Sequence, residues 1–162
     1  MEGRHVVRED VTAHLVPAAL AGLVAAVAGG IVWGLIVRWT DYEIGFAAWG
    51  IGLLVGTAVL FGARGARGVH LSVLAVVLAL IGILIGKYLA FVWVLRDAAN
   101  EANVSLNTPI FSGDTWNQFM DAKSDVWSFF DLLWIGLAVV TAFRIPAPQR
   151  APEEPAAEGP AE

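Results

Sequence analysis

The sequence contains no cysteine and only three histidines. The absence of cysteine excludes disulfides, thiol redox chemistry and cysteine-ligated metal sites, and it does not identify a compartment. The histidines, His5, His14 and His70, are scattered along the chain and lack the spacing of metal ligands. Lysine and arginine number ten against fifteen acidic residues, and they form no basic patch of the kind that nucleic acid requires. We therefore expect no metal and no nucleic-acid partner.

Motifs that carry catalysis are also missing. No glycine-rich loop ends in Lys followed by Ser or Thr, and no serine has a histidine and an acid within reach in one register. Asp114, Asp121 and Asp125 carry ligand oxygens for a hard cation, but their spacing matches no calcium loop. We expect no catalytic residues and no cofactor, and the sequence does not favour an enzyme.

Long apolar runs are abundant, since 57% of the residues are hydrophobic. A run of about 20 apolar residues crosses the hydrocarbon core of a bilayer as a helix. In lipid an unpaired backbone amide costs several kcal/mol, so such a run has no alternative to the helix. The sequence predicts an all-α integral membrane protein, a four-helix bundle with spans at 15–37, 44–61, 69–95 and 126–143. The third span is longer than needed, so we expect it to tilt or to emerge from the membrane.

Polar segments divide the rest of the chain. Residues 1–14 form a polar N-terminal segment, and residues 15–144 form the transmembrane domain, with a long loop at 96–125. Residues 145–162 are rich in Pro, Ala and Glu and cannot bury a core, so we expect a disordered acidic tail.

The start of the first span allows two interpretations. In a retained helix, Pro17 would lie in the first turn, where its missing N–H costs little. A signal peptide cleaved after Ala26-Val27-Ala28 is the alternative. The apolar run continues past Ala28, and Glu9 and Asp10 interrupt the basic segment, so the retained helix fits better.

Basic residues near the span ends predict the orientation, because cytoplasmic loops carry an excess of Lys and Arg. Three lie on one side of the predicted topology, and six lie on the other: Arg4, Arg8, Arg64, Arg67, Arg144 and Arg150. Both termini should therefore be cytoplasmic (N-in and C-in), with the loop at 96–125 outside. All seven tryptophans then fall in the outer half, which fits either an aromatic belt at the lipid headgroups or an outer binding surface.

Small residues recur at steps of four in the first three spans. Close backbone contact and dispersion drive helix association in lipid, and small residues permit that contact. The stripes predict a tight bundle with little room for a wide aqueous pore. They leave open whether they pack within one protomer or against a second protomer or partner. The candidate packing residues are Gly22, Gly30, Gly34, Gly45, Gly52, Gly56, Gly82 and Gly86.

Charged residues gather near the outer ends of the spans. Lys87 lies inside the third span, where a lysine costs about 2.5–3.5 kcal/mol at the bilayer centre and less toward its edge. Asp131 lies at a similar depth in the fourth span. We predict an outer-leaflet polar cluster of Arg38, Asp41, Glu43, Lys87 and Asp131, with Lys87 paired to Asp131 or Glu43. Such a cluster is either structural or an ion or ligand site at the outer mouth.

The outer loop carries a helical pattern of its own. Five aromatic or apolar residues and one lysine recur at steps of three and four: Trp116, Phe119, Met120, Lys123, Trp127 and Phe130. Thr115 and Gln118 fit a capping box. The pattern predicts an amphipathic outer-surface helix between the third and fourth spans, packed on the bundle or resting in the headgroups.

Two runs carry a family resemblance. Residues 40–56 contain TDYEIG followed by AWGIGLLVG, and residues 82–88 read GILIGKY. Both runs resemble a group of small, uncharacterised bacterial multi-span membrane proteins, in which a GYEIG…AxGIGxxVG run opens the second helix. Asp41 departs from that pattern, which has Gly there. The resemblance covers about the first 95 residues, implies a bacterial cytoplasmic (inner) membrane location and carries no activity.

Together these features favour a non-catalytic interaction or assembly module of the inner membrane. Its partners would be the lipid bilayer and either a second copy of itself or another membrane protein. A small transporter or channel subunit that uses the outer charged cluster is the alternative.

Overall fold

The computed structural model describes residues 3–40, 45–103, 109–122 and 129–149, with side chains from His14 onward, and these ranges contain helices and no strand. The predicted all-α class is therefore confirmed. Some of the expectations concern residues outside this description. These are the N-terminal side chains, residues 41–44 and 123–128, and the tail from 150 onward. The helices are α1 (Gly3–Thr40), α2 (Phe46–Gly62), α3 (Val69–Glu101), α4 (Gly113–Asp121) and α6 (Phe129–Arg144).

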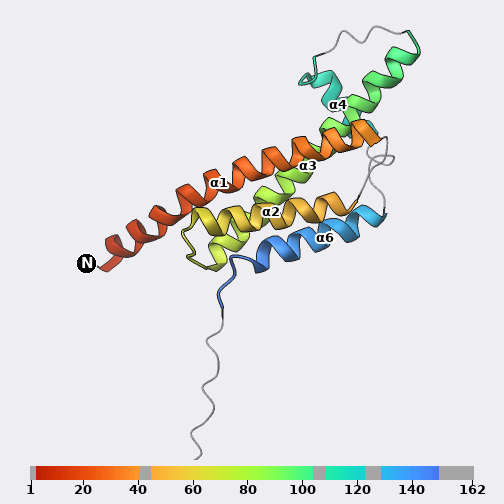
Figure 1. The fold of residues 1–162 in the computed structure, drawn as a ribbon. Helices are drawn as coiled ribbons and strands as arrows, with labels where there is room; N and C mark the ends of the chain where they lie inside the picture. The colour runs from red at the N-terminus through yellow and green to blue at the C-terminus, as the bar shows by residue number, and fades with distance from the viewer. Residues whose placement is uncertain (1–2, 41–44, 104–108, 123–128, 150–162) are drawn as a thin grey trace, which may run out of the picture.

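Four of these helices lie side by side, and α4 stands apart from them at one end (Figure 1). α1 packs along α3 and α2, while α6 packs along α2 and α3. α4 contacts the C-terminal part of α3. We call the end that carries α4 the α4 end. The opposite end, where residues 63–68 join α2 to α3, is the turn end.

Two helices are longer than the sequence predicts. α1 begins at Gly3, so Pro17 lies inside the helix, and the expectation of Pro17 in the first turn is wrong. Residues 4–16 contain no Gly or Pro, so no helix-breaking residue separates Gly3 from the apolar run that follows. α3 continues to Glu101 and has 33 residues, about 50 Å at 1.5 Å per residue, which exceeds a hydrocarbon core of about 30 Å.

At three of the predicted packing glycines, an added Cβ would come within 3.0 Å of the backbone of a neighbouring helix. A Cβ at Gly30 would lie 2.7 Å from the carbonyl oxygen of Gly82, and a Cβ at Gly82 would lie 2.9 Å from that of Ala26. At Gly52 the added atom would lie 2.5 Å from the carbonyl oxygen of Ala138. Each of these distances is too short for two packed atoms, so any side chain would force the helices apart.

The other five glycines of the set face side chains of the same chain. An added Cβ would come within 3.0 Å of a neighbouring side chain at Gly22, Gly34, Gly45, Gly56 and Gly86. The glycine stripes are therefore occupied by packing within the protomer. Two other helical glycines, Gly50 and Gly136, have no such neighbour within 4 Å.

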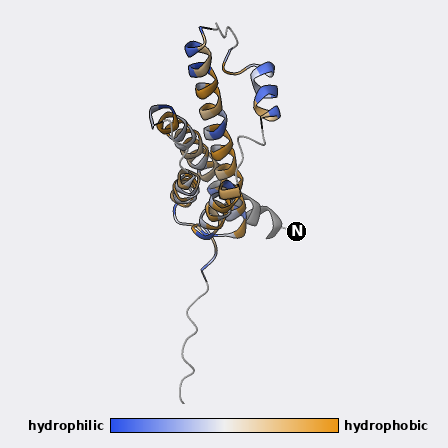
Figure 2. Cartoon of the chain, turned by 90° about the vertical axis from the view of Figure 1, so that its right-hand side faces the viewer, coloured by the Kyte–Doolittle hydropathy of each residue, from blue (hydrophilic) through white to orange (hydrophobic). Residues whose placement is uncertain are grey.

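The outward faces of the four packed helices are apolar. Val16, Leu20 and Val24 on α1 and Leu132 and Leu133 on α6 are all more than half exposed. Figure 2 shows hydrophobic colour along these helices, with hydrophilic colour at α4, the adjoining end of α3 and the turns. By length and composition, two described helical stretches are able to cross a membrane, and α2 is a shorter apolar helix of 17 residues. The two long stretches are His14–Thr40 and Val69–Glu101.

Candidate functional site

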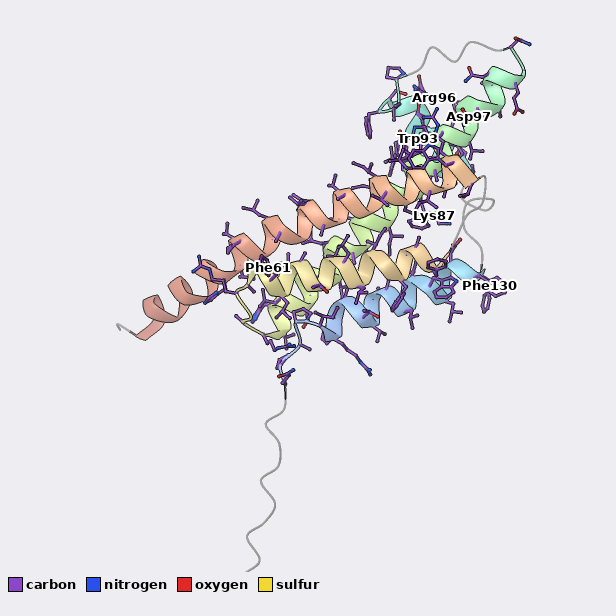
Figure 3. The ribbon with its side chains drawn as sticks, viewed as in Figure 1. Phe61, Lys87, Trp93, Arg96, Asp97 and Phe130 are labelled. Atoms are coloured by element: carbon purple, nitrogen blue, oxygen red, sulfur yellow. The ribbon has the colours of Figure 1, made fainter. Side chains whose placement is uncertain are left out.

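Lys87 on α3 and Asp131 on α6 form an ion pair inside the bundle, near the α4 end (Figure 3). The Lys87 Nζ donates to the Asp131 Oδ2 at 2.8 Å, and the two side chains are only 1% and 8% exposed. Lys87 is therefore held inside the bundle and does not extend to the surface. Since each charge is buried, removing one partner would break an ion pair that little solvent screens. The pair fixes α3 and α6 to each other.

Of the three described residues of the predicted polar cluster, the structure brings Lys87 and Asp131 together. The guanidinium carbon of Arg38 lies 5.8 Å from the centroid of the Trp93 ring, which is a cation–π geometry. Arg38 thus contacts an aromatic face of α3. Asp41 and Glu43 lie outside the described residues.

The first turn of α4 is capped by a different residue from the one predicted. Ser112 has extended backbone angles, and its Oγ accepts a hydrogen bond from the amide of Thr115 at 3.2 Å. Ser112 is therefore the N-cap, and the predicted capping box of Thr115 and Gln118 is wrong. Thr115 lies inside the helix, where its hydroxyl donates to the carbonyl of Pro109 at 3.2 Å.

Tyr88 is the centre of an aromatic cluster that joins α3 to α4. Its ring centroid lies 5.5 Å from that of Phe119, 5.7 Å from that of Trp116 and 6.0 Å from that of Phe111. The Tyr88 hydroxyl also donates to the carbonyl of Ile110. Aromatic pairs contribute about 0.5–1.5 kcal/mol each beyond their buried area. This cluster forms a second small core, separate from the main one, that holds α4 against α3.

An apolar pocket of about 400 Å³ opens beside this cluster. Small-molecule sites usually measure about 300–1,000 Å³, so the pocket can hold a small apolar group. Its polar side-chain groups are the hydroxyls of Tyr88 and Ser112, which both make hydrogen bonds, and the indole N–H of Trp116. The lining contains no charged group, and hence no evident acid, base or metal ligand. The pocket is lined by Leu84, Ile85, Tyr88, Leu89, Phe111, Ser112, Gly113 and Trp116.

Trp33 departs from the predicted aromatic belt. It is only 2% exposed, and its ring fills the space that Gly86 leaves open. Its Nε1 has no hydrogen-bond partner among the described residues. Trp39, by contrast, is exposed at the end of α1, as a belt residue would be. The belt interpretation therefore does not hold for Trp33, because a glycine on α3 makes room for the indole.

Sequence reasoning found the α4 stripe but missed its docking site. Phe119 contacts Tyr88 and Val92, which lie four residues apart on α3. In an almost uniformly apolar helix each face looks alike, so no pattern distinguished this one. The only available signal was the polar hydroxyl of Tyr88, which needs a partner when buried.

Comparisons with protein-family models, with curated proteins and with solved structures give no match to this chain.

Proposed function

We propose that the chain is a bacterial inner-membrane protein that crosses the bilayer four times, through α1, α2, α3 and α6, with both termini in the cytoplasm. The main support is the apolar outer surface of the packed helices. A water-soluble bundle places polar residues on that face, whereas a helix that is hydrophobic all round is buried or lipid-exposed. The likeness of residues 40–56 and 82–88 to small bacterial multi-span proteins supports the location.

The absence of cysteine gives a direct test of this topology. Single cysteines replace Arg64 at the turn end and Ala102 at the α4 end, and intact cells are treated with a membrane-impermeant maleimide. We expect labelling at Ala102→Cys only, with Arg64→Cys labelled after the cells are opened. Equal labelling at both positions in intact cells, or a protein that stays soluble without detergent, would contradict the proposal.

Within that membrane protein, we propose a non-catalytic interaction or assembly role. The supporting observation is that the buried polar pair and the packing glycines make their contacts within the chain itself. Lys87 is paired with Asp131, and the predicted packing glycines are filled by the protomer itself. An apolar pocket between α3 and α4 remains open. Its chemistry suits an apolar side chain of a partner membrane protein or of a second copy of this chain.

Photo-crosslinking in native membranes tests this role. Phe111 borders the pocket and is 81% exposed, while Phe61 is 83% exposed at the turn end and serves as the matched control. A photoreactive phenylalanine analogue at position 111 should give one discrete protein adduct, and the same analogue at 61 should not. An adduct at twice 17.2 kDa would identify a second copy of the chain. No adduct at 111, or the same adduct at both positions, would contradict the proposal.

The buried ion pair favours one alternative, a small transporter or channel subunit. Ionisable residues inside membrane spans often mark ion pathways or proton relays. If Lys87 and Asp131 serve that role, reconstituted vesicles should show ion or solute flux that Lys87→Ala abolishes and Arg38→Ala retains. Vesicles without flux would leave the pair with its structural role.

A further inference from the structure

A cavity of about 270 Å³ lies at the turn end, opposite the aromatic cluster. Basic side chains reach it from three elements: His14 from α1, Arg67 from the turn and His70 from the start of α3. All three are exposed, so they are accessible to a ligand. The cavity thus combines one permanent positive charge with two imidazoles.

Arg67 is held in place by the segment that follows α6. Its Nη1 donates to the carbonyl of Ile145, and the amide of Gly68 donates to the carbonyl of Pro146 at 2.9 Å. A guanidinium carries five N–H donors, so the bond to Ile145 leaves most of them for an anion. This anchoring reduces the side-chain entropy that a ligand would otherwise have to overcome.

The α4 end carries charges of both signs, whereas the described charges of the turn end are all positive. The described carboxylates all lie toward the α4 end: Asp97, Glu101, Asp114, Asp121 and Asp131. The described arginines of the turn end are Arg64, Arg67 and Arg144. Among the described side chains, the cavity therefore has no acid beside it to compete for its cations.

The remaining walls of the cavity are apolar. Leu15, Ala66 and Leu71 line it, and all three pack against the main core. On α3, exposed Val73 and Val77 follow His70 at steps of three and four, so they extend an apolar surface from the cavity toward the middle of the bundle. A ligand that fits both parts has an anionic head and a hydrocarbon body.

We propose that this cavity binds the phosphate group of an anionic phospholipid in the inner leaflet. The inference rests on the proposed membrane location and orientation, which place the turn end at the cytoplasmic surface. Arg67 would donate a charge-assisted pair of hydrogen bonds to the phosphate oxygens, and His14 and His70 would close around it. Basic pockets between membrane helices on the cytoplasmic side bind anionic headgroups in this way. The acyl chains would lie along the apolar faces of α1 and α3.

The test is lipid binding by the purified full chain in mild detergent, measured by native mass spectrometry. Phosphatidylglycerol is compared with zwitterionic phosphatidylcholine, and inorganic phosphate is added as a competitor. We expect tighter binding of phosphatidylglycerol, weakened about fivefold in Arg67→Gln, as loss of one basic contact near a membrane surface implies. Arg64→Gln is the matched control, because it removes the same charge from the same turn but lines a different cavity. Its binding should stay within about twofold of wild type, since it loses only a distant charge.

Several outcomes would overturn the inference. Equal binding of both lipids by the wild type would do so, as would equal losses in Arg67→Gln and Arg64→Gln. Displacement of the lipid by an equal concentration of inorganic phosphate would assign the site to soluble phosphate. If Arg67→Gln does not fold, the double variant His14→Gln/His70→Gln, which keeps the bond to Ile145, must show the same loss. Failure here with the predicted cysteine labelling intact would reject the lipid site and leave the proposed topology standing.

Discussion

Replacing Gly52 by alanine should force α2 and α6 apart. The new Cβ would lie 2.5, 2.7 and 2.9 Å from the carbonyl oxygen, the Cα and the carbonyl carbon of Ala138. All three are backbone atoms of α6, so no rotamer change can relieve the collision. Overpacking costs about 1–3 kcal/mol, and we expect the upper part of that range because the backbone itself must move.

That cost converts into a measurable shift. For a chain of this size 1 kcal/mol corresponds to roughly 2–4 °C in Tm, so Gly52→Ala should lower the Tm by roughly 4–12 °C. The assay is thermal unfolding of the detergent-purified protein, followed by tryptophan fluorescence at a fixed scan rate. The ion pair of Lys87 and Asp131 joins α6 to α3 and not to α2. It therefore does not relieve the collision between α2 and α6.

Gly136→Ala on α6 is the matched control. It is the same substitution at an exposed position of α6, but no atom outside the local backbone lies within 4 Å of the new Cβ. Alanine is about 0.5–1 kcal/mol better than glycine inside a helix, so this variant should keep or slightly raise the Tm. Equal Tm values for Gly52→Ala and wild type, or equal losses in both variants, would refute the reasoning about helix contact.

Three further predictions follow from the α4 end. Lys87→Met or Asp131→Asn alone should lower the free energy of unfolding by about 3–5 kcal/mol, because either change breaks an ion pair between two buried side chains. The double variant should be less destabilised than the sum of the two, and a double-mutant-cycle coupling near zero would rule out the pair. Tyr88→Phe removes the bond to the Ile110 carbonyl, worth about 1 kcal/mol, and should speed hydrogen exchange in α4 while leaving the bundle protected. Ser112→Ala removes the α4 N-cap, at a cost of about 1 kcal/mol, and unchanged exchange in the first turn of α4 would contradict that assignment.

Much of the fold could be predicted from the sequence, because helix formation depends on neighbours in the chain. The apolar runs predicted helices at positions that α1, α2, α3 and α6 cover, and the stripe from Trp116 to Met120 predicted α4. The packing glycines were also recognisable, since the absence of a side chain is a property of the residue itself. The errors were at helix ends, at Pro17 and at Ser112, where the start of a helix depends on a few weak local interactions.

The candidate sites depended on the tertiary structure. Sequence alone gave Lys87 two candidate acidic partners, and the packing of α3 against α6 brings one of them, Asp131, within 2.8 Å of it. The sequence predicted Trp33 as part of an outer aromatic belt or binding surface. In the structure Trp33 is buried, because Gly86 on another helix leaves space for its ring.

The same division separates the apolar composition of the chain from two of its cavities. The apolar composition of the helices belongs to the sequence. Which side chains enclose a cavity depends on the tertiary structure. His14, Arg67 and His70 come together only after distant segments have packed, and the same holds for Tyr88 and Trp116. The physical reason is range, because hydrogen bonds within a helix join residues four apart, whereas a cavity requires walls from helices separated by tens of residues.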